Sequence, residues 1–200
     1  MITRPVQQTD ADSIARVHER ALPWSINGRL GHSHLKGMYE RLLSGPDCVG
    51  YVSLHKDEII AFQVSTTDWE AARKRLAEID WRSKARVVGT CLLHPYDLFA
   101  LFEVAFLIPR AFRRTKVKAE IMAWAAEPAN PIAVMGAHQC LLSSIAELAS
   151  RGEKKCLGQM QKPNERPMKA LSKLSPVIFS KYIRNDVLIF NCTEIAKKAV

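Results

Sequence analysis

The chain has 200 residues, 48% of them hydrophobic, so it can bury a core without disulfide or metal cross-links and suits a single domain. Its formal net charge of +9 indicates a polyanionic binding partner: a phosphate-rich cofactor, nucleic acid or an anionic membrane surface. The cysteines argue against a disulfide framework, because they are odd in number and lack a C-x-x-C pair; they are Cys48, Cys91, Cys140, Cys156 and Cys192. Reduced, mostly buried thiols are typical of a cytoplasmic protein, and the residues after Met1 show no apolar leader.

The sequence also disfavours a membrane-spanning helix, a nucleic-acid interface and a metal site. The most apolar run, 87–109, contains His94, Asp97 and Glu103, which argues against a membrane-spanning helix. The basic cluster at 110–118 has no interleaved aromatic residue beyond Phe112, so a nucleic-acid partner is not expected and a solvated basic face is favoured. The cysteines and histidines show no metal-ligand spacing, so no metal is expected.

The first third of the chain predicts a strand, two helices and a hairpin. In order these are a strand at Ile2–Gln7, a helix from the N-cap Thr9–Asp12 to Pro23, a helix at His32–Ser44, and two strands at Cys48–Leu54 and Ile59–Thr66. Ile14, Val17 and His18 recur at helical spacing on the apolar face of the first helix.

The middle of the chain predicts a helical insert at about 67–118. It comprises a charged helix at Trp69–Ile79 and an apolar part, 87–112, that forms two short helices split near Pro95. The insert is longer than a connection needs. Its apolar surface is expected to cover the acceptor side of a site, to mate with a second subunit as a homodimer, or to accommodate an apolar acyl chain or substrate.

The last third predicts a buried strand at Ala119–Pro128, which organises the chain. It is followed by a turn at Pro131–Gly136, a helix at His138–Arg151, a strand at Lys155–Gln161, a short helix at Asn164–Leu174 and a hairpin of Val177–Ile183 with Val187–Cys192. The sum is β-α-α-β-β-(helical insert)-β-α-β-α-β-β, one mixed α/β domain over residues 1–200. A helix N-terminus just after a central strand is an anion site suited to a pyrophosphate.

Five segments carry motif-like residues in a familiar order: Ile2–Ile14 with D-A-x-x-I, Leu22–Gly31, Ile60–Thr67, Glu120–Pro128 and Asn164–Ser175. Together they resemble the GCN5-related N-acetyltransferase (GNAT) superfamily over nearly the whole chain. The resemblance implies an α/β fold with splayed central strands and N-acyl transfer from acetyl-CoA, or another acyl-CoA, to a small-molecule amine or protein acceptor.

The chain departs from the pattern of this family at two motifs. Where the family has the pyrophosphate loop R/Q-x-x-G-x-G/A, residues 131–138 keep only Gly136, and the leading Arg or Gln is absent. The tyrosine that serves as general acid in many relatives is replaced by Leu171, which cannot donate a proton.

The resemblance assigns roles to particular residues. Backbone N–H groups of Trp124, Ala125 and Ala126 are expected to polarise the thioester carbonyl. Glu120 is either the general base, acting directly or through a water, or a strand-end carboxylate paired with Lys118 or Arg113. Tyr182 is the replacement candidate for the general acid, or packs across strands.

The remaining candidates bind the cofactor or the acceptor. Gly136, Ala137, His138 and Asn164 are expected at the cofactor, with Asn164 alternatively an N-cap; Trp24, Tyr39 and Trp69 line the acceptor pocket or belong to the core. Two other readings remain open: an inactive GNAT-like scaffold that binds a ligand or partner, and a transferase with a carrier-protein-linked acyl donor that needs fewer phosphate contacts.

Overall fold

The computed structural model describes residues 1–78, 81–161 and 174–199. Seven strands form one sheet in the order β1-β2-β3-β4-β5-β7-β6. The strands are β1 (Ile2–Pro5), β2 (Cys48–His55), β3 (Glu58–Thr66), β4 (Glu120–Ala126), β5 (Lys155–Gln161), β6 (Val177–Lys181) and β7 (Asn185–Asn191). β4 and β5 are parallel and the other neighbours are antiparallel, so the predicted mixed α/β sheet is confirmed.

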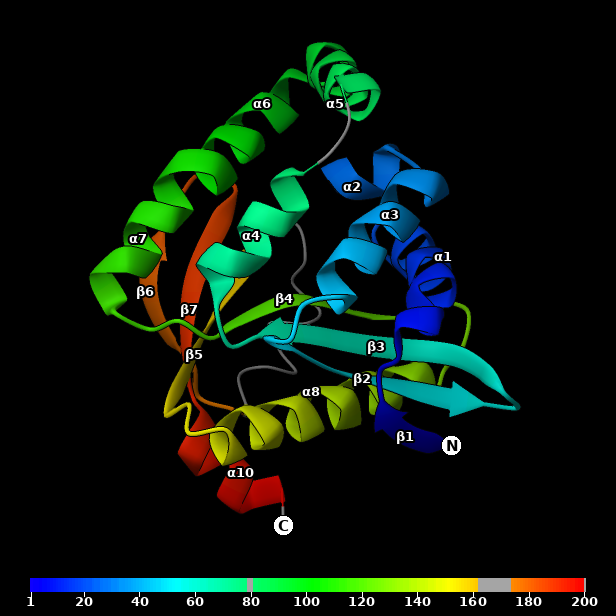
Figure 1. Cartoon of the computed structure of the whole chain (residues 1–200), viewed down its shortest axis with the longest axis vertical. Helices are drawn as coiled ribbons and strands as arrows, with labels where there is room; N and C mark the ends of the chain where they lie inside the picture. Colours follow the sequence, from blue (N-terminus) through cyan, green and yellow to red (C-terminus); the bar gives the residue numbers. More distant parts are fainter. Residues whose placement is uncertain (79–80, 162–173, 200) are drawn as a thin grey trace.

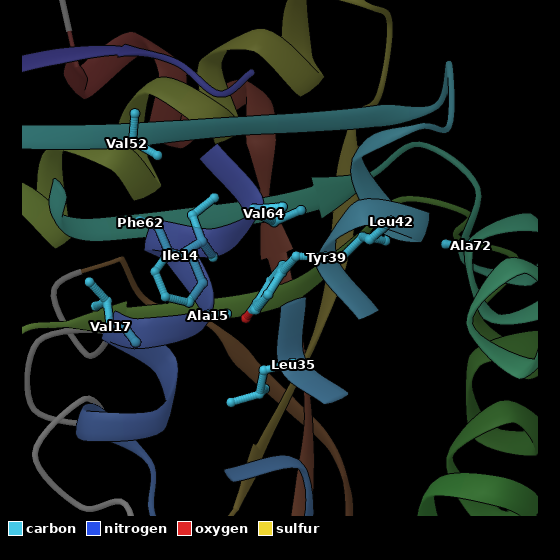
Figure 2. Close-up of a cluster of buried hydrophobic side chains, with 12 residues drawn as sticks. Ile14, Ala15, Val17, Leu35, Tyr39, Leu42, Val52, Phe62, Val64 and Ala72 are labelled. Atoms are coloured by element: carbon cyan, nitrogen blue, oxygen red, sulfur yellow. The ribbon is translucent and has the colours of Figure 1, made fainter. Parts of the chain in front are cut away.

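Helices cover both faces of this sheet. α1 (Ala11–Ala21), preceded by the turn η1 (Gln8–Asp10), packs with α3 (His32–Leu43) on one face. α8 (Ala133–Ser150) and α10 (Cys192–Ala199) lie together on the other face (Figure 1). Figure 2 shows Ile14, Tyr39 and Phe62 meeting in the apolar cluster between α1, α3 and β3, where all three side chains are fully buried.

The segment between β3 and β4 is helical, as the sequence predicts. It contains α4 (Trp69–Ala77), α5 (Trp81–Leu93), α6 (Pro95–Phe102), the π-helical turn η2 (Glu103–Leu107) and α7 (Ile108–Thr115). Trp69 and Phe112 pack against Leu157 of β5 and Val187 of β7. Side chains alternate across a strand, so this contact covers the face opposite α10, which packs against Cys156 and Leu188.

Two boundaries differ from the sequence prediction for identifiable reasons. The predicted turn at Pro131–Gly136 is wrong, because α8 already begins at Ala133. Asn130 starts the helix early: its side-chain Oδ1 accepts the N–H of Ile132 at 3.1 Å and its carbonyl accepts that of Ala133 at 3.1 Å. β7 begins at Asn185 rather than Val187, because Asn185 pairs with Gln161 in the β5–β7 ladder.

Two short helices were not expected from the sequence. α2 (Ile26–Arg29) is capped by Ser25, whose Oγ accepts the N–H of Gly28 at 3.0 Å. α10 follows β7 directly, and Asn191 Oδ1 accepts the N–H of Glu194 at 3.3 Å. The short helix predicted at Asn164–Leu174 falls almost wholly outside the described residues. Among the residues described, no helix is both long and apolar enough for a membrane crossing.

Candidate active site

The two parallel strands β4 and β5 part soon after they begin to pair. Their register runs through Glu120↔Leu157 and Ile121↔Gly158, and β5 then continues with β7. In Figure 1, β2, β3 and β4 run across the view while β5, β7 and β6 run up it. The splayed central strands expected from the resemblance are therefore present.

A cavity of about 260 Å³ occupies the place where β4 and β5 part. Its walls come from both faces of the sheet. On the α1 face they include His18, Trp24, Ile26, Leu101 and Val104; on the α8 face they include Trp124, Leu141, Leu188 and Phe190. Because one cavity is lined from both faces, it leads through the sheet between the two strands.

The backbone of β4 turns particular N–H groups toward this cavity. Glu127 N–H donates to Ile60 of β3 at 2.7 Å, and the register then pairs Ala125 with Phe62. Alternation in an antiparallel ladder turns the N–H of Ala125 to β3 as well, and turns those of Trp124 and Ala126 to the opposite side, where β5 has departed. A register shift between Val64 and Ser65 of β3 determines which N–H groups of β4 face β3 and which face away from it. Trp124 and Ala126 are thus the N–H donors best placed for an oxyanion, whereas Ala125 is not.

Trp124 also fixes the wall on the α8 side. Its indole Nε1–H donates to the carbonyl of Ala137 at 2.8 Å, which ties β4 to the second turn of α8. Ala137 is buried under this contact, and His138 is half-buried on the next position of the helix. Ala137 is therefore held in a structural contact, and His138 lies within α8 and not at the helix start where the sequence analysis placed it.

The start of α8 offers less to a pyrophosphate than the sequence analysis expected. The N–H groups of Ile132 and Ala133 donate to Asn130, and those of Met135 and Gly136 donate to the carbonyl of Ile132. Four early donors are thus engaged within the turn. Val134 and Met135 project apolar side chains into solvent there, each 62% exposed.

Gly136 has a packing role in this structure. A Cβ on Gly136 would lie 2.7 Å from Ser53 Oγ and 2.8 Å from Ser53 Cβ, so the missing side chain lets α8 approach β2. This close approach accounts for the glycine without a phosphate.

Glu120 lies at the base of β4 and is fully buried. Its Oε1 accepts from Arg73 Nη2 at 3.2 Å, and Arg73 also stacks over Trp69 and Phe112. Burial raises the pKa of Glu120 above its ordinary value, and the Arg73 charge opposes that rise. An ion pair was one of the two expectations for Glu120, although its partner is Arg73 rather than Lys118 or Arg113. Glu120 is not among the described residues that line the cavity.

The other candidates divide between cavity and core. Trp24 lines the cavity beside α2. Tyr39 is buried in the α1–α3 cluster, and Trp69 is buried with its Nε1–H donated to Val117 O at 3.2 Å. Tyr182 follows β6, and its hydroxyl donates to Leu107 O at 3.3 Å in a separate hollow. Asn164 lies outside the described residues.

The cavity wall includes polar side chains to which the sequence does not point, among them His18, Gln159 and Asn185. Each carries a buried atom without a hydrogen-bond partner in the described structure, namely His18 Nε2, Gln159 Oε1 and Asn185 Oδ1. The Asn185 amide is oriented by Glu103, because its Nδ2 donates to Glu103 Oε2 at 2.8 Å. In the sequence, His18 reads as one more residue of an apolar helix face, and Asn185 reads as a turn residue.

Solved structures that match the chain share this architecture. A PaiA N-acetyltransferase from Thermoplasma acidophilum, in complex with coenzyme A, is 11% identical, with a TM-score of 0.58 over 95% of this chain and 98% of its own. An aminoglycoside 6'-acetyltransferase type Ii is 11% identical, with a TM-score of 0.60 over 96% and 97%. FeeM, an N-acyl amino acid synthase from uncultured soil microbes, is 9% identical, with a TM-score of 0.58 over 100% of both chains.

No protein-family profile and no curated protein sequence matches the chain. At these low identities the structural matches establish the fold. The chain has the fold of the GNAT superfamily, as the order of its motifs indicated.

Proposed function

We propose that the chain is an N-acyltransferase that moves an acyl group from a pantetheine-type thioester, such as acetyl-CoA, to an amine. The observation that carries this proposal is the cavity through the sheet where β4 and β5 part, with the N–H groups of Trp124 and Ala126 directed to the parting. Fixed backbone donors in an enclosed site stabilise the oxyanion that forms when an amine attacks a thioester carbonyl.

The two faces of the cavity suit the two substrates. The α8 face is apolar, with Leu141, Leu188 and Phe190, and suits an acyl–pantetheine arm. The α1 face adds His18 and the aromatic Trp24, and suits an amine acceptor. Leu101 and Val104 of the insert complete this side, which supports the expectation that the insert covers the acceptor.

One observation favours a donor that depends little on its nucleotide. At the start of α8, the N–H groups of Ile132 and Ala133 are engaged by Asn130 and those of Met135 and Gly136 by the carbonyl of Ile132. The Met135 side chain projects into solvent beside them. An acyl group on a carrier protein is attached through the same pantetheine arm without the nucleotide. A carrier-linked acyl donor is therefore the second candidate.

Calorimetric titration at low salt separates these donors. Acetyl-CoA, free CoA and S-acetyl-pantetheine serve as probes. We expect acetyl-CoA and S-acetyl-pantetheine to bind within about tenfold of each other, since few phosphate contacts are available. If no probe binds, the proposal of a thioester-binding site is wrong. The inactive-scaffold alternative then remains, and the search turns to a protein partner.

The homodimer expected from the apolar insert stays a prediction. Leu98, Phe99, Phe102 and Phe106 are between 46% and 65% exposed on α6 and η2. Light scattering on the purified protein tests the dimer, and a monomer at all concentrations would contradict it.

A further inference from the structure

His18 occupies a distinctive place in the cavity wall. It lies in the last turn of α1, is 5% exposed, and its ring stacks on Phe62 at a centroid distance of 6.3 Å. Its Nδ1 is 2.6 Å from the hydroxyl of Tyr39, which comes from α3 and is fully buried. A buried tyrosine hydroxyl and the stacked Phe62 thus fix the orientation of the imidazole.

The second ring nitrogen of His18, Nε2, is buried and is not used by any hydrogen bond within the described structure. A buried polar atom without a partner costs about 1–3 kcal/mol, and a ligand that bonds to it would offset this cost. His18 lines the cavity, and Nδ1 is turned toward Tyr39 at the opposite edge of the ring. A group bound in the cavity is therefore the natural partner of Nε2.

The protonation states suit a proton acceptor. Burial, with a smaller contribution from the charge of His34, lowers the pKa of His18 from 6.5 to about 4, so the imidazole is neutral at physiological pH. Burial raises the pKa of Tyr39 well above 10.0, so its hydroxyl stays protonated. When an N–H donor meets Nε2, the imidazole takes the tautomer in which Nδ1–H donates to Tyr39 Oη.

We propose that His18 is the general base of the transfer and that Tyr39 is its positioning residue. This inference rests on the proposed function and adds the group that handles the proton. It also names the acceptor class: a small primary amine with an apolar body, because Leu22, Trp24 and Ile26 line the cavity beside His18.

Acyl transfer from the thioester to the amine conserves atoms and charge. The amine lone pair attacks the thioester carbonyl carbon, the C–N bond forms, and the carbonyl π pair moves to oxygen, facing the N–H groups of β4. His18 Nε2 takes one proton from the attacking nitrogen. The oxyanion then re-forms the carbonyl, the C–S bond breaks, and the leaving thiolate takes the proton from the imidazolium. Amine and thioester have become amide and thiol, and His18 is neutral again.

The low pKa of His18 does not oppose this role. The same removal from water that disfavours an imidazolium also disfavours an ammonium in the cavity. Transfer of a proton between the two leaves the number of buried charges unchanged.

The test measures thiol release with acetyl-CoA as donor and butylamine or phenethylamine as acceptor. His18→Gln is expected to lower kcat by about a hundredfold or more, with acetyl-CoA affinity and Tm close to the wild-type values. His18→Ala is expected to regain part of its turnover with added imidazole, which fits the space left by the side chain. His34→Gln is the matched control, because His34 lies nearby on α3 and does not line the cavity, and it is expected to keep turnover.

Tyr39→Phe keeps the ring and removes the hydroxyl. We expect turnover to fall by about tenfold. We also expect the ¹⁵N resonances of His18 to show a change of tautomer, which a purely structural role would not produce. Wild-type turnover in a folded His18→Gln variant would overturn the inference and leave the proposed function standing. No thiol release by the wild type with either amine would overturn both.

Discussion

The guanidinium of Arg73 donates to Oε1 of Glu120 across 3.2 Å, which joins helix α4 of the insert to the base of the central strand β4. Arg73 Nη1 also donates to Val104 O at 2.9 Å. The contact gives Glu120 a structural partner below the cavity, and the partner comes from a helix 47 residues away in the sequence.

This pair gives the first prediction. Arg73→Met is expected to lower the free energy of unfolding by about 3 kcal/mol, because it leaves a buried carboxylate without its cation. Glu120→Gln is expected to change it by about 1 kcal/mol or less, since Gln stays neutral and still accepts from Arg73. Denaturant unfolding at neutral pH measures both.

The same Glu120→Gln variant separates the two candidate bases. Because Glu120 does not line the cavity, turnover is expected to stay within about threefold of wild type. A loss of about a hundredfold in a folded Glu120→Gln protein would instead make Glu120 the general base and displace His18.

Acid stability gives the second prediction. The unfolded chain protonates His18 near pH 6.5, whereas the folded chain does so near pH 4, so the unfolded state binds more protons between these values. Stability therefore falls as pH drops through this window, and His18 accounts for about 3 kcal/mol of the loss. The fall is expected to be shallower by that amount in His18→Gln. NMR titration should show that the His18 imidazole stays neutral well below pH 6.5, and an ordinary titration of His18 would contradict the burial argument.

Helix α8 gives the third prediction. Gly136→Ala places a Cβ against Ser53, so α8 must shift and the cost is about 1–3 kcal/mol of unfolding free energy. The double variant Gly136→Ala with Ser53→Gly lacks both clashing atoms, Ser53 Oγ and Cβ, and is expected to regain most of the lost stability. Gly89→Ala in α5 is the control, because a Cβ built there meets no neighbouring atom of the described residues within 4 Å, and the substitution is expected to stabilise slightly. Equal costs at Gly89 and Gly136 would show that helix packing on Ser53 is not the cause.

Much of the fold could be predicted from residue order alone. The hairpin at 48–66, the helical insert and the strand at 119–128 all carry their own local signals, namely β-branched runs, turn residues and apolar periodicity. The start of α8 could not be placed, because it depends on the hydrogen bonds of Asn130, and the motif pattern favoured a loop there.

The site was harder to predict for a different physical reason. The motifs point to Trp24 and Trp124, and both lie in the cavity wall. The helical spacing places His18 on an apolar helix face, and it does lie there. Its importance comes from Tyr39 and from the cavity, which only the tertiary structure brings to it.

A buried carboxylate in η2 gives the fourth prediction. Glu103 is 3% exposed and accepts from Arg184 N–H at 3.0 and 3.2 Å and from Asn185 Nδ2. Glu103→Ala is expected to cost about 2–3 kcal/mol of unfolding free energy, because it leaves these N–H donors without an acceptor. It also frees the Asn185 amide, so KM for the acceptor is expected to rise. Glu194→Ala, at an exposed carboxylate, is the control, and an equal loss there would contradict the argument.

The central claim is that acyl transfer takes place in the cavity where β4 and β5 part, and its most direct test is thiol release by a variant that fills it. Ala123 lines the cavity on β4, so Ala123→Phe is expected to abolish amine-dependent thiol release from acetyl-CoA while the protein stays folded by circular dichroism. Ala85→Phe, at an exposed position of α5, is the matched control and is expected to keep the wild-type rate. An unchanged rate in folded Ala123→Phe would place the chemistry elsewhere, and no release by the wild type would contradict the account.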